Sequence, residues 1–551
     1  MRILLLVHAF NSLAQRLYVE LAERGHTLSI EFDVNDGVTV EAVERFRPDV
    51  LLAPFLKRAI PEVVWRRLPC LVVHPGPPGD RGPSSLDWAV LEGAERWGVT
   101  VLQANGTFDA GDVWASRGFP MRAAPKASLY RHEVTEAAVE AVLEALERLE
   151  RGEAPVPVDP ALVRERPAMR QADRAIDWSR DDTATVLRKV RSGDGVPGVR
   201  DGDVSLFDAH PERRLTGEPG AWLAQWQGAA CRATVDGAVW IGSMKARSPG
   251  VHAPTLKLPS AMVLAADLPE VQGDHRDLWY EEADGVGYLH FPFYNGAMGA
   301  EQCARLLAAY QEALARDTRV LVLMGGDDFW SNGIHLNVIE AASSPADESW
   351  RTINAIDDVA RAVLTTTDKL TVSALSGNAG AGGVFLALAA DRVWARGGVV
   401  LNPHYKGMGN LYGSEYWTYV LPRRVGEERA RAVTEARLPM GTPEARRLGL
   451  VDAAFGLRVA DFRAEVRERA RALAADPALP ALLADKHARR AADEAAKPLE
   501  QYRAEELERM RFNFYGFDPS YHVARYNFVF KVPKSRTPLY LAAHRRTCPH
   551  P

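Results

Sequence analysis

Continuous apolar runs alternate with amphipathic segments over about the first 150 residues of the chain. The runs RILLLVHAF, RPDVLLAPF and PCLVVHPG each contain an unbroken apolar stretch, which is typical of strands buried on both faces of a sheet. The segment SLAQRLYVELAERG has the three- and four-residue apolar spacing of a helix and ends at Gly25. This alternation predicts a doubly wound parallel sheet, in which ligand-binding side chains gather at the carboxyl ends of the strands.

The pattern changes twice farther along the chain. After a long helical segment and a Pro-rich linker near residues 152–165, short alternating runs such as DGDVSLFDA predict a small β domain. Alternation of strands and helices then resumes until about residue 495, and the chain ends in a charged helix and an aromatic, basic tail. The domains of the multidomain α/β fold that we expect are 1–165, 166–266, 267–495 and 496–551.

Composition and charge narrow the class of protein. With 551 residues, 47% of them apolar and 25% charged, the chain has the make-up of several globular domains. Its 67 basic and 72 acidic residues give a net charge of −5, so we expect neither nucleic acid nor a membrane as a partner. The four cysteines form no CxxC pair, so we expect no metal site and no disulfide framework.

The start of the chain bears on its location. MRILLLVHAF lacks the length and the cleavage site of a signal peptide and is better explained as a buried first strand. A run of about 18 apolar residues, as a membrane span needs, does not occur in the sequence. We therefore expect a cytoplasmic protein.

A histidine at the end of one predicted strand is the first candidate for chemistry. His74 ends the run PCLVVH, and the loop PGPPGDRG that follows is rich enough in Pro and Gly to let backbone approach a ligand. The turn FDAGDVW after the next strand places Asp109 at what we expect to be the same edge of the sheet. A carboxylate beside an imidazole fixes its tautomer and supports the imidazolium, so these two residues are predicted to transfer protons. The alternative is a purely structural histidine.

The residues around His74 resemble a known family, the 10-formyltetrahydrofolate-dependent formyltransferases and hydrolases. The resemblance rests on VVHPGPPGDRG, on the DAGD turn and on RPDVLLAPFLKRAIPEVV. The later segment AIDWSRDDTATVLRKVRSGDGVPGVRDGDVSLFDA looks like the small, OB-like β-barrel that follows the catalytic domain in methionyl-tRNA formyltransferase. Over roughly the first 265 residues, the resemblance implies a formyltransferase fold and 10-formyltetrahydrofolate as the formyl donor.

One position departs from the pattern of this family. The family has an asparagine two positions before the histidine, where this chain has Val72, and that side chain would donate a hydrogen bond to the developing oxyanion, worth about 3 kcal/mol. Either Gln15, Asn11 or Asn105 replaces the donor, or the transfer is slower or differently arranged. Gln15 and Asn11 follow the first strand, so we expect them on the folate side, with Arg131 as a candidate for binding the anionic end of the substrate. Capping or packing of the first helix is the alternative role of Gln15.

Two glycine-bearing turns in the second half of the chain form another candidate site. In VLVLMGGDDFWSNGIHLN and LSGNAGAGGVFLALAADRVWA, a buried strand runs into a glycine turn and a helix start, and no Lys-Ser/Thr pair follows, which excludes a P-loop. Together with GTPEARRLGLVDAAF, these segments resemble the crotonase (enoyl-CoA hydratase/isomerase) superfamily over residues 280–490. The resemblance implies coenzyme A as a ligand, bound near Gly333 and Gly383, and an oxyanion hole formed by the backbone N–H groups of Ile334 and Gly382. Close helix–strand packing is the alternative role of these glycines.

The two carboxylates that hydratases of this superfamily use do not carry over. Phe385 and His404 stand at their positions, which argues against addition of water. The nearest carboxylate is Glu415 in the aromatic stretch LYGSEYWTY, where burial would raise its pKa and suit it to work as a general base; a surface glutamate is the alternative. His404 is the competing base, and Tyr405 is predicted to bind the departing sulfur or to orient Glu415. The aromatic side chains expected to exclude water are Tyr412, Tyr416 and Trp417.

A formyltransferase-like half joined to a crotonase-like half resembles the hydrogenase maturation factors that supply carbon monoxide to the active-site iron of nickel–iron hydrogenase. The resemblance implies an enzyme that moves a formyl group from 10-formyltetrahydrofolate to coenzyme A and then breaks formyl-CoA into CO and CoA. It also implies the hydrogenase large subunit, or its iron-loading maturation complex, as a partner.

Two other functions stay open at this point. One is a formyltetrahydrofolate hydrolase or formyltransferase whose crotonase domain is only a scaffold, and the other is a non-catalytic sensor of folate or CoA. The basic tail either contacts CoA phosphates through Lys531, Lys534 or Arg536, or is a solvated terminus.

Overall fold

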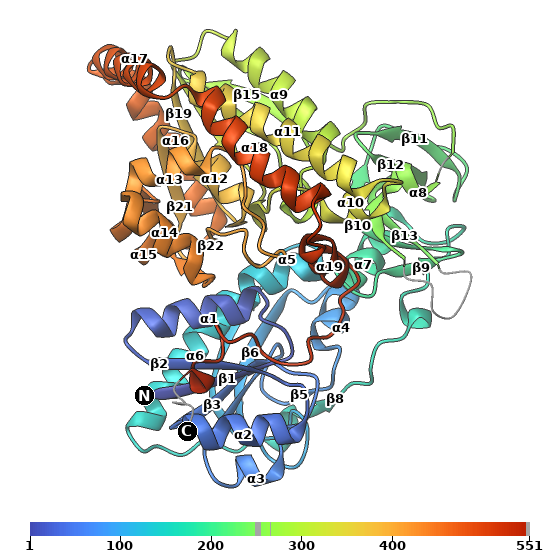
Figure 1. Ribbon diagram of the computed structural model, residues 1–551. Helices are drawn as coiled ribbons and strands as arrows, with labels where there is room; N and C mark the ends of the chain where they lie inside the picture. The colour runs from blue at the N-terminus through green and yellow to red at the C-terminus, as the bar shows by residue number, and fades with distance from the viewer. Residues whose placement is uncertain (248–254, 265, 547–551) are drawn as a thin grey trace. The chain divides into compact units, whose positions relative to one another are not determined.

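The chain folds into two compact units (Figure 1). The computed structural model describes residues 1–247, 255–264 and 266–546. One unit consists of Met1–His275 with Lys534–Pro551, and the other of Arg276–Pro533. The first unit therefore holds the formyltransferase-like segment, the small β segment and the end of the chain. The finer domain boundaries stay predictions.

A six-stranded sheet forms the centre of the first unit. In spatial order its strands are β2 (Thr27–Phe32), β1 (Arg2–Val7), β3 (Val50–Phe55), β4 (Cys70–His74), β6 (Arg96–Gln103) and β7 (Val113–Pro120). The pairs among β2, β1, β3 and β4 are parallel, and most of their side chains are buried, as the continuous apolar runs predict. These four strands have the expected doubly wound arrangement.

The last two strands correct the expectation of a wholly parallel sheet. β6 runs antiparallel to β4, with His74 opposite Thr100, and β7 runs antiparallel to β6. The helix between β4 and β6, α4 (Ser85–Glu92), has only eight residues, and the chain re-enters the sheet beside the end of β4 instead of crossing back to its start. An apolar run has the same pattern in either direction, so the sequence gives no sign of this reversal.

Helices around this sheet position several candidate residues. α1 (Ser12–Glu23) packs against α6 (Thr135–Glu150), and the buried Arg16 joins them through an ion pair with Glu136 at 2.8 Å. The long helix expected before the Pro-rich linker is present, but α5 (Lys126–Leu129) joins α6 through a π-helical turn, η1 (Tyr130–Val134). Such turns are rare and occur frequently at functional sites.

The segment after the linker forms a second, smaller sheet, as predicted. In spatial order its strands are β11 (Trp222–Trp226), β12 (Ala229–Ala233), β13 (Ala238–Ala246), β10 (Val204–Glu212) and β9 (Val199–Asp201), with β14 (Lys257–Pro259) paired to β13. All of these pairs are antiparallel, and α7 (Thr183–Gly193) packs on β10. The pairings between described residues form a path from β11 to β9, so closure into an OB-like barrel stays a prediction.

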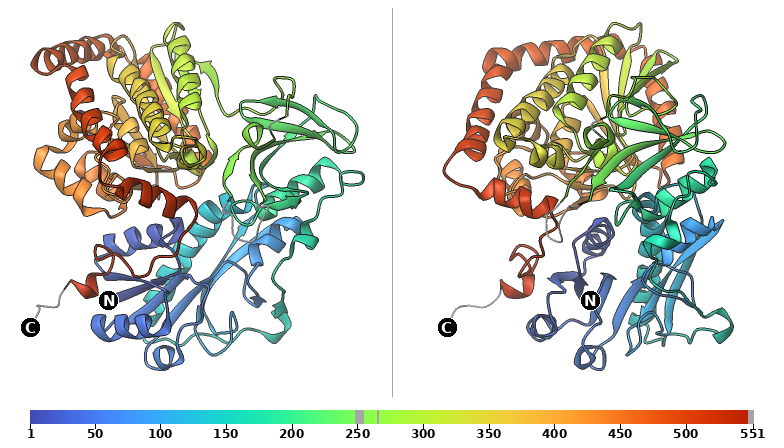
Figure 2. Two further views of the ribbon diagram at one scale, coloured as in Figure 1. Left: turned by 45° about the vertical axis from the view of Figure 1, so that its right-hand side comes forward. Right: turned by 90° about the vertical axis from the view of Figure 1, so that its right-hand side faces the viewer.

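Residues 534–546 belong to the first unit, and the short helix η5 (Ala543–Arg545) lies beside β2 (Figure 2). The backbone N–H of Ile30 donates to the carbonyl of Leu541 at 3.1 Å. His544 is buried, with its Nδ1 2.7 Å from Oγ of Ser29 and its Nε2 2.9 Å from Oε2 of Glu31. Residues 537–544 are therefore docked on the edge of the sheet, while the basic side chains of Lys531, Lys534 and Arg536 are exposed.

Two sheets form the second unit. The larger contains, in spatial order, β15 (Trp279–Ala283), β16 (Val286–His290), β17 (Val320–Met324), β19 (Leu370–Leu375), β21 (Arg392–Arg396) and β24 (Ala453–Phe455). The smaller contains β18 (Phe329–Ser331), β20 (Asn378–Gly380), β22 (Val400–Asn402) and β23 (Met440–Gly441). Each of β17, β19 and β21 is followed along the chain by a strand of the smaller sheet, and β18, β20 and β22 pair in parallel. The turns after these short strands therefore lie side by side, which brings the two glycine-bearing turns together.

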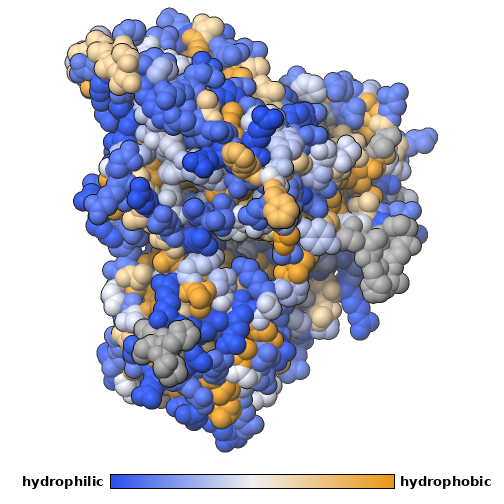
Figure 3. All heavy atoms as spheres, in the orientation of Figure 1, coloured by the Kyte–Doolittle hydropathy of each residue, from blue (hydrophilic) through white to orange (hydrophobic). Residues whose placement is uncertain are grey.

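Helices pack around the two sheets of the second unit. α11 (Pro345–Thr365) packs between α9 (Ala300–Leu314) and α18 (Leu499–Tyr515), while α16 (Val459–Ala475) packs on the larger sheet (Figure 1). No helix among the described residues has both the length and the apolar character that crossing a membrane requires. The face in Figure 3 is mostly hydrophilic, with apolar side chains scattered over it.

Two candidate active sites

His74 lies between two carboxylates at the end of β4. Its Nε2 is 3.0 Å from Oδ2 of Asp80, and its Nδ1 is 3.3 Å from Oδ1 of Asp109. The side chains of His74 and Asp80 are almost fully buried, and that of Asp109 is mostly buried. The structure thus brings His74 and Asp109 together, as expected, and adds a third group, Asp80, that the sequence does not single out.

The Gly-rich loop after β4 brings Asp80 to the imidazole. A Cβ on Gly76 would lie 2.4 Å from Oδ2 of Asp80 and 2.5 Å from Nε2 of His74, so only glycine leaves room for this contact. Asp80 begins the short strand β5 (Asp80–Arg81), which pairs with β8 (Arg164–Glu165). An aspartate flanked by glycines six residues after the histidine is the sequence signal that would have identified it.

Asp109 reaches His74 from the loop between β6 and β7. Because β6 is antiparallel to β4, with Gln103 opposite Leu71, this loop leaves the sheet beside the start of β4 and not beside its end. The expectation that both residues follow the same edge is therefore wrong, and the contact forms because the loop folds back. Asp109 has a left-handed φ of 53°, and its Oδ2 accepts a hydrogen bond from the N–H of Gly82 at 3.2 Å.

Charge at this site favours an imidazolium. Burial alone would lower the pKa of His74, but the hydrogen bonds and charges of Asp109 and Asp80 outweigh it and raise the pKa to about 9. Burial would raise the pKa of Asp109, but His74 outweighs burial and holds that pKa below its usual value. At neutral pH His74 is therefore an imidazolium, with Nε2 toward Asp80 and Nδ1 toward Asp109.

The predicted folate-side residues cluster at the exit of β1. Asn11 caps α1 by accepting from the N–H of Ala14 at 3.0 Å, and its Nδ2 donates to the hydroxyl of Tyr130 at 3.2 Å. Gln15 donates from Nε2 to the carbonyl of Phe10 at 2.9 Å. These contacts tie the start of α1 to the π-helical turn η1, which also carries Arg131. The folate-binding roles of Asn11, Gln15 and Arg131 stay predictions, as does the donor that replaces the asparagine missing at Val72.

In the second unit, the two glycine turns meet at the start of a helix. A Cβ on Gly333 would lie 3.3 Å from the backbone nitrogen of Gly382, which is the first residue of α12 (Gly382–Leu388). As a first-turn residue, Gly382 has an N–H without an intrahelical acceptor. A short β-bridge joins Met298 to the turn that holds Gly333. In this bridge the N–H of Met298 donates to the carbonyl of Gly333, and the N–H of His335 donates to the carbonyl of Met298. The bridge therefore does not use the N–H of Ile334. Both predicted oxyanion donors are thus in adjacent turns.

Gly383 and Ala381, the residues on either side of Gly382, are both tightly constrained. A Cβ on Gly383 would lie 2.1 Å from the carbonyl oxygen of Ser331, so close packing accounts for this glycine. Ala381, just before the helix, has φ 48° and ψ −128°, a strained conformation for a residue with a side chain. Strain of this kind is concentrated at functional sites, where the surrounding structure holds it in place.

Glu415 is buried against the same turn. Its side chain is almost inaccessible, and a Cβ on Gly382 would lie 2.2 Å from its Oε1. The hydroxyl of Tyr405 donates to Oε2 of Glu415 at 2.5 Å. Glu415 and Tyr416 have consecutive left-handed φ angles of 60° and 58°. The surface glutamate considered from the sequence is therefore wrong, and the carboxylate faces the predicted oxyanion hole.

Further buried carboxylates surround Glu415. Oδ1 of Asp357 accepts from the N–H of Glu415 and from Oγ of Ser414, both at 2.8 Å. Glu506 accepts from the N–H of Tyr416 at 3.0 Å. Burial, and then the negative charge of Asp357, raise the pKa values of Glu415 and Glu506 above their usual range. The sequence did not mark Asp357 or Glu506 as site residues, because each is one carboxylate among many on a long charged helix.

Aromatic side chains enclose the carboxylate. Phe385, at the position of a hydratase glutamate, stacks on Tyr405 with ring centroids 5.1 Å apart. The ring centroid of Trp417 lies 6.3 Å from that of Phe385 and 5.5 Å from that of Tyr412. The side chain of Tyr416 is fully buried. A chain of ring contacts therefore runs from Tyr412 through Trp417 and Phe385 to Tyr405, the donor to Glu415, and exclusion of water by these rings stays a prediction.

His404, the competing base, has a neutral and weakly basic imidazole. Burial, and then the charge of Arg437, lower its pKa to about 4, so its imidazole is neutral at physiological pH. Its Nδ1 is buried and has no hydrogen-bond partner among the described residues. The choice between Glu415 and His404 as the base therefore stays open.

The basic residues near the end of the chain have protein contacts. Arg536 pairs with Glu41, and Nζ of Lys534 lies 5.4 Å from the centroid of the Phe32 ring. Contact of these residues with CoA phosphates stays a prediction, as it does for Lys531.

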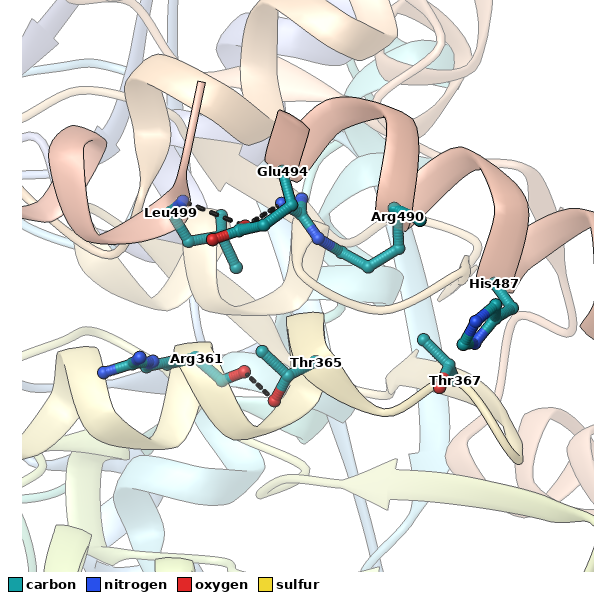
Figure 4. A pocket seen from close by; sticks show the side chains of 8 residues that line it. Arg361, Thr365, Thr367, His487, Arg490, Glu494 and Leu499 are labelled. Carbon is teal, nitrogen blue, oxygen red and sulfur yellow. Dashed lines mark hydrogen bonds and ion pairs between the residues drawn. The ribbon is translucent and has the colours of Figure 1, made fainter. Parts of the chain in front are cut away.

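A surface cavity of about 270 Å³ in the second unit is lined by none of the candidate residues (Figure 4). It lies between α11 and α17 (Leu479–Ala496), whose side chains face each other across it. Arg361 pairs with Glu500 at 3.3 Å and Arg490 with Glu494, so its arginines already have acidic partners.

Comparison with known proteins identifies both halves. The family model for formyl transferases matches residues 31–146, and the model for enoyl-CoA hydratase/isomerase matches residues 285–515. A methionyl-tRNA formyltransferase of Citrifermentans bemidjiense is 29% identical over 165 residues, which cover 29% of this chain and 52% of that protein.

Two relatives span nearly the whole chain. The hydrogenase maturation factor HoxX of Bradyrhizobium diazoefficiens is 60% identical over 557 residues, which cover 99% of this chain and 97% of that protein. The crystal structure of HypX from Aquifex aeolicus in complex with tetrahydrofolic acid has a TM-score of 0.96 and 52% identity, and covers 99% of both chains.

Proposed function

The chain belongs to the family of hydrogenase maturation factors that includes HoxX and HypX, and on this basis we propose that it makes carbon monoxide for a hydrogenase. The first unit moves the formyl group of 10-formyltetrahydrofolate to coenzyme A, and the second breaks formyl-CoA into CO and CoA. The tetrahydrofolic acid in the Aquifex structure supports folate as the first substrate. The hydrogenase large subunit, or its iron-loading maturation complex, is the proposed partner.

In the first unit, His74 works as a proton donor. The sulfur of CoA attacks the formyl carbon, a C–S bond forms, and the C–N10 bond breaks with its electron pair going to N10. His74 gives its proton to N10, and the thiol proton restores the imidazolium. Gln15, Asn11 or Asn105 would supply the oxyanion donor that the asparagine missing at Val72 would otherwise be.

In the second unit, Glu415 removes the formyl proton. The C–H electrons form the third bond of CO while the C–S bond breaks, and its electron pair goes to sulfur. The N–H groups of Ile334 and Gly382 hold the formyl oxygen, and Tyr405 orients Glu415 or binds the sulfur. Glu415 then returns the proton to the thiolate, so that formyl-CoA gives CO and CoA with no water added. The aromatic surround keeps water from hydrolysing the thioester.

The observation that carries this proposal is the buried carboxylate of Glu415 against the N–H end of α12, at a site with no hydratase glutamates. Formyl-CoA has no α-carbon, so the usual enolate chemistry of such a site is impossible and its only removable C–H is the formyl one.

The test supplies formyl-CoA directly and follows CO release by haem binding. We expect Glu415→Gln to lose activity by about 10²-fold or more and Tyr405→Phe to lose less, while His404→Asn stays close to the unsubstituted protein. Loss in His404→Asn with none in Glu415→Gln would make His404 the base. Formate in place of CO from the unsubstituted protein would reject the decarbonylation altogether.

A further inference from the structure

Asp357, on α11, has no role in the chemistry proposed above, yet it lies directly behind Glu415. It is fully buried and comes from a different part of the sequence, 58 residues away. Its Oδ1 accepts two hydrogen bonds, from the N–H of Glu415 and from the hydroxyl of Ser414. The same hydroxyl lies 3.3 Å from Oε2 of Glu415, so one serine links the two carboxylates.

The charge of Asp357 is only partly compensated. Its Oδ2 is buried and has no hydrogen-bond partner among the described residues. The nearest cation is Arg503, with Nε at 3.9 Å from Oδ2, and that guanidinium pairs more closely with Asp358 at 2.6 Å. A buried carboxylate with this little compensation is costly, since each buried charge normally requires a partner. Because this energetic cost lies next to a reactive group, it indicates that the buried charge of Asp357 contributes to the reaction.

We propose that Asp357 is a positioning residue of the second site: it holds the backbone turn that carries Glu415 and keeps a negative charge beside that carboxylate, and so sets its strength as a base. The inference rests on the proposed decarbonylation. The formyl C–H is a weak acid, so the base that removes it has to be stronger than an ordinary carboxylate, and a fixed neighbouring charge in a buried site supplies that strength.

The turn itself requires this support. Glu415 and Tyr416 have consecutive left-handed φ angles, which residues with side chains adopt only when the surroundings hold them. Asp357 holds the first of these N–H groups, and Glu506 on α18 holds the second. Two more side chains of α18, spaced four and seven residues after Glu506, hold the same loop: Sδ of Met510 accepts from the N–H of Gly413, and Oδ1 of Asn513 from the N–H of Tyr412.

The groups facing Glu415 determine the sign of each test. Burial, and then the charge of Asp357, raise the pKa of Glu415, while the hydrogen bonds of Tyr405 and Ser414 lower it. Burial, and then the charge of Asp357, raise the pKa of Glu506, while the charge of Arg503 beside Oδ2 opposes the burial that raises the pKa of Asp357. Asparagine at position 357 can accept the same two hydrogen bonds without the charge, so Asp357→Asn separates charge from geometry.

The experiment measures kcat for CO release from formyl-CoA between pH 5 and 9. In Asp357→Asn the acid limb should move to lower pH by about one unit and the plateau should fall by about tenfold, because Glu415 becomes a weaker base. In Ser414→Ala the limb should move the opposite way, to higher pH, because Glu415 loses a donor. KM should change little in both. The matched control is Asp347→Asn, an exposed carboxylate in the first turn of α11, which should leave the limb in place.

The outcomes separate the two proposals. An acid limb that stays in place in Asp357→Asn, or one that moves equally in Asp347→Asn, overturns the role of Asp357 while the decarbonylation stands. If Asp357→Asn does not fold, Asp357→Ser decides: its hydroxyl is neutral like the amide, so the limb should again move to lower pH, and an unmoved limb in that variant overturns the role. Failure of the unsubstituted protein to release CO would instead reject the decarbonylation on which the inference rests.

Discussion

Removing the charge of Asp80 should release the proton of His74 at a lower pH. The rise in the pKa of His74 from 6.5 to about 9 corresponds to about 3 kcal/mol in favour of the imidazolium. Burial opposes this rise, so Asp80 and Asp109 together supply more than that amount. Their contacts, at 3.0 and 3.3 Å, are similar, so each accounts for at least about half. In Asp80→Asn, whose amide oxygen still accepts from Nε2, we expect the pKa of His74 to fall to about 7.5 or below.

The assay is an NMR titration of protein labelled at the Cε1 carbon of histidine, with His74→Asn to assign the signal. Asp112→Asn, an exposed carboxylate in the loop that carries Asp109, is the control and should titrate like the unsubstituted protein. The alkaline limb of formyl transfer should move down with the NMR pKa, because the imidazolium is the proposed proton donor. A His74 pKa near 6.5 in the unsubstituted protein, or one that is unchanged in Asp80→Asn, would refute this reasoning.

The free energy of unfolding should also depend on the protonation of His74. Because the folded protein holds it more tightly than the unfolded chain, His74 stabilises the fold fully below about pH 6.5, and this contribution disappears as the pH rises to about 9. In Asp80→Asn the contribution is smaller and should be lost by about pH 7.5. Chemical denaturation at pH 6, 7.5 and 9 measures both effects.

Three further predictions concern other parts of the chain. Gly382→Ala places a Cβ 2.2 Å from Oε1 of Glu415 and should lower CO release from formyl-CoA by about 10²-fold, and an unchanged rate would contradict the placement of Glu415. Burial would raise the pKa of Glu31, but hydrogen bonds from the docked end of the chain lower it, so its carboxylate stabilises the first unit at neutral pH and loses this effect as the pH falls below about 4.5. Glu31→Gln should therefore cost about 1–3 kcal/mol at pH 7 and less at pH 4 in chemical denaturation, and equal costs would contradict the assignment. Gln15→Ala and Arg131→Ala should weaken folate binding in calorimetry, and unaltered affinity in both would remove their proposed roles.

The strands and most helices could be predicted because burial leaves a periodic trace in the sequence. The continuous apolar runs of β1, β3 and β4 are examples, and so is the helix that ends at Gly25. The direction of β6 could not be predicted, since an apolar run is the same read either way. The docking of the chain end on β2 was also missed, because Thr537 and His544 are polar and find their partners more than 500 residues away.

The candidate sites were predictable only where a short motif carries the geometry. His74, Asp109 and the two glycine turns lie in such motifs. Asp80 lies in the Pro- and Gly-rich loop after β4, but its contact with His74 depends on the space left by Gly76. Asp357 and Glu506 act on a loop distant in sequence, and nothing local distinguishes them from solvated carboxylates on a helix.

The most direct test of the central claim follows a labelled formyl carbon through the whole protein. The purified chain is given 10-formyltetrahydrofolate labelled with carbon-13 at the formyl group, together with CoA, and the gas is trapped on reduced haem. The proposed two-step reaction predicts labelled CO in amounts equal to the tetrahydrofolate formed, and none when CoA is left out. Labelled formate with no CO, or CO formation that does not depend on CoA, would contradict it.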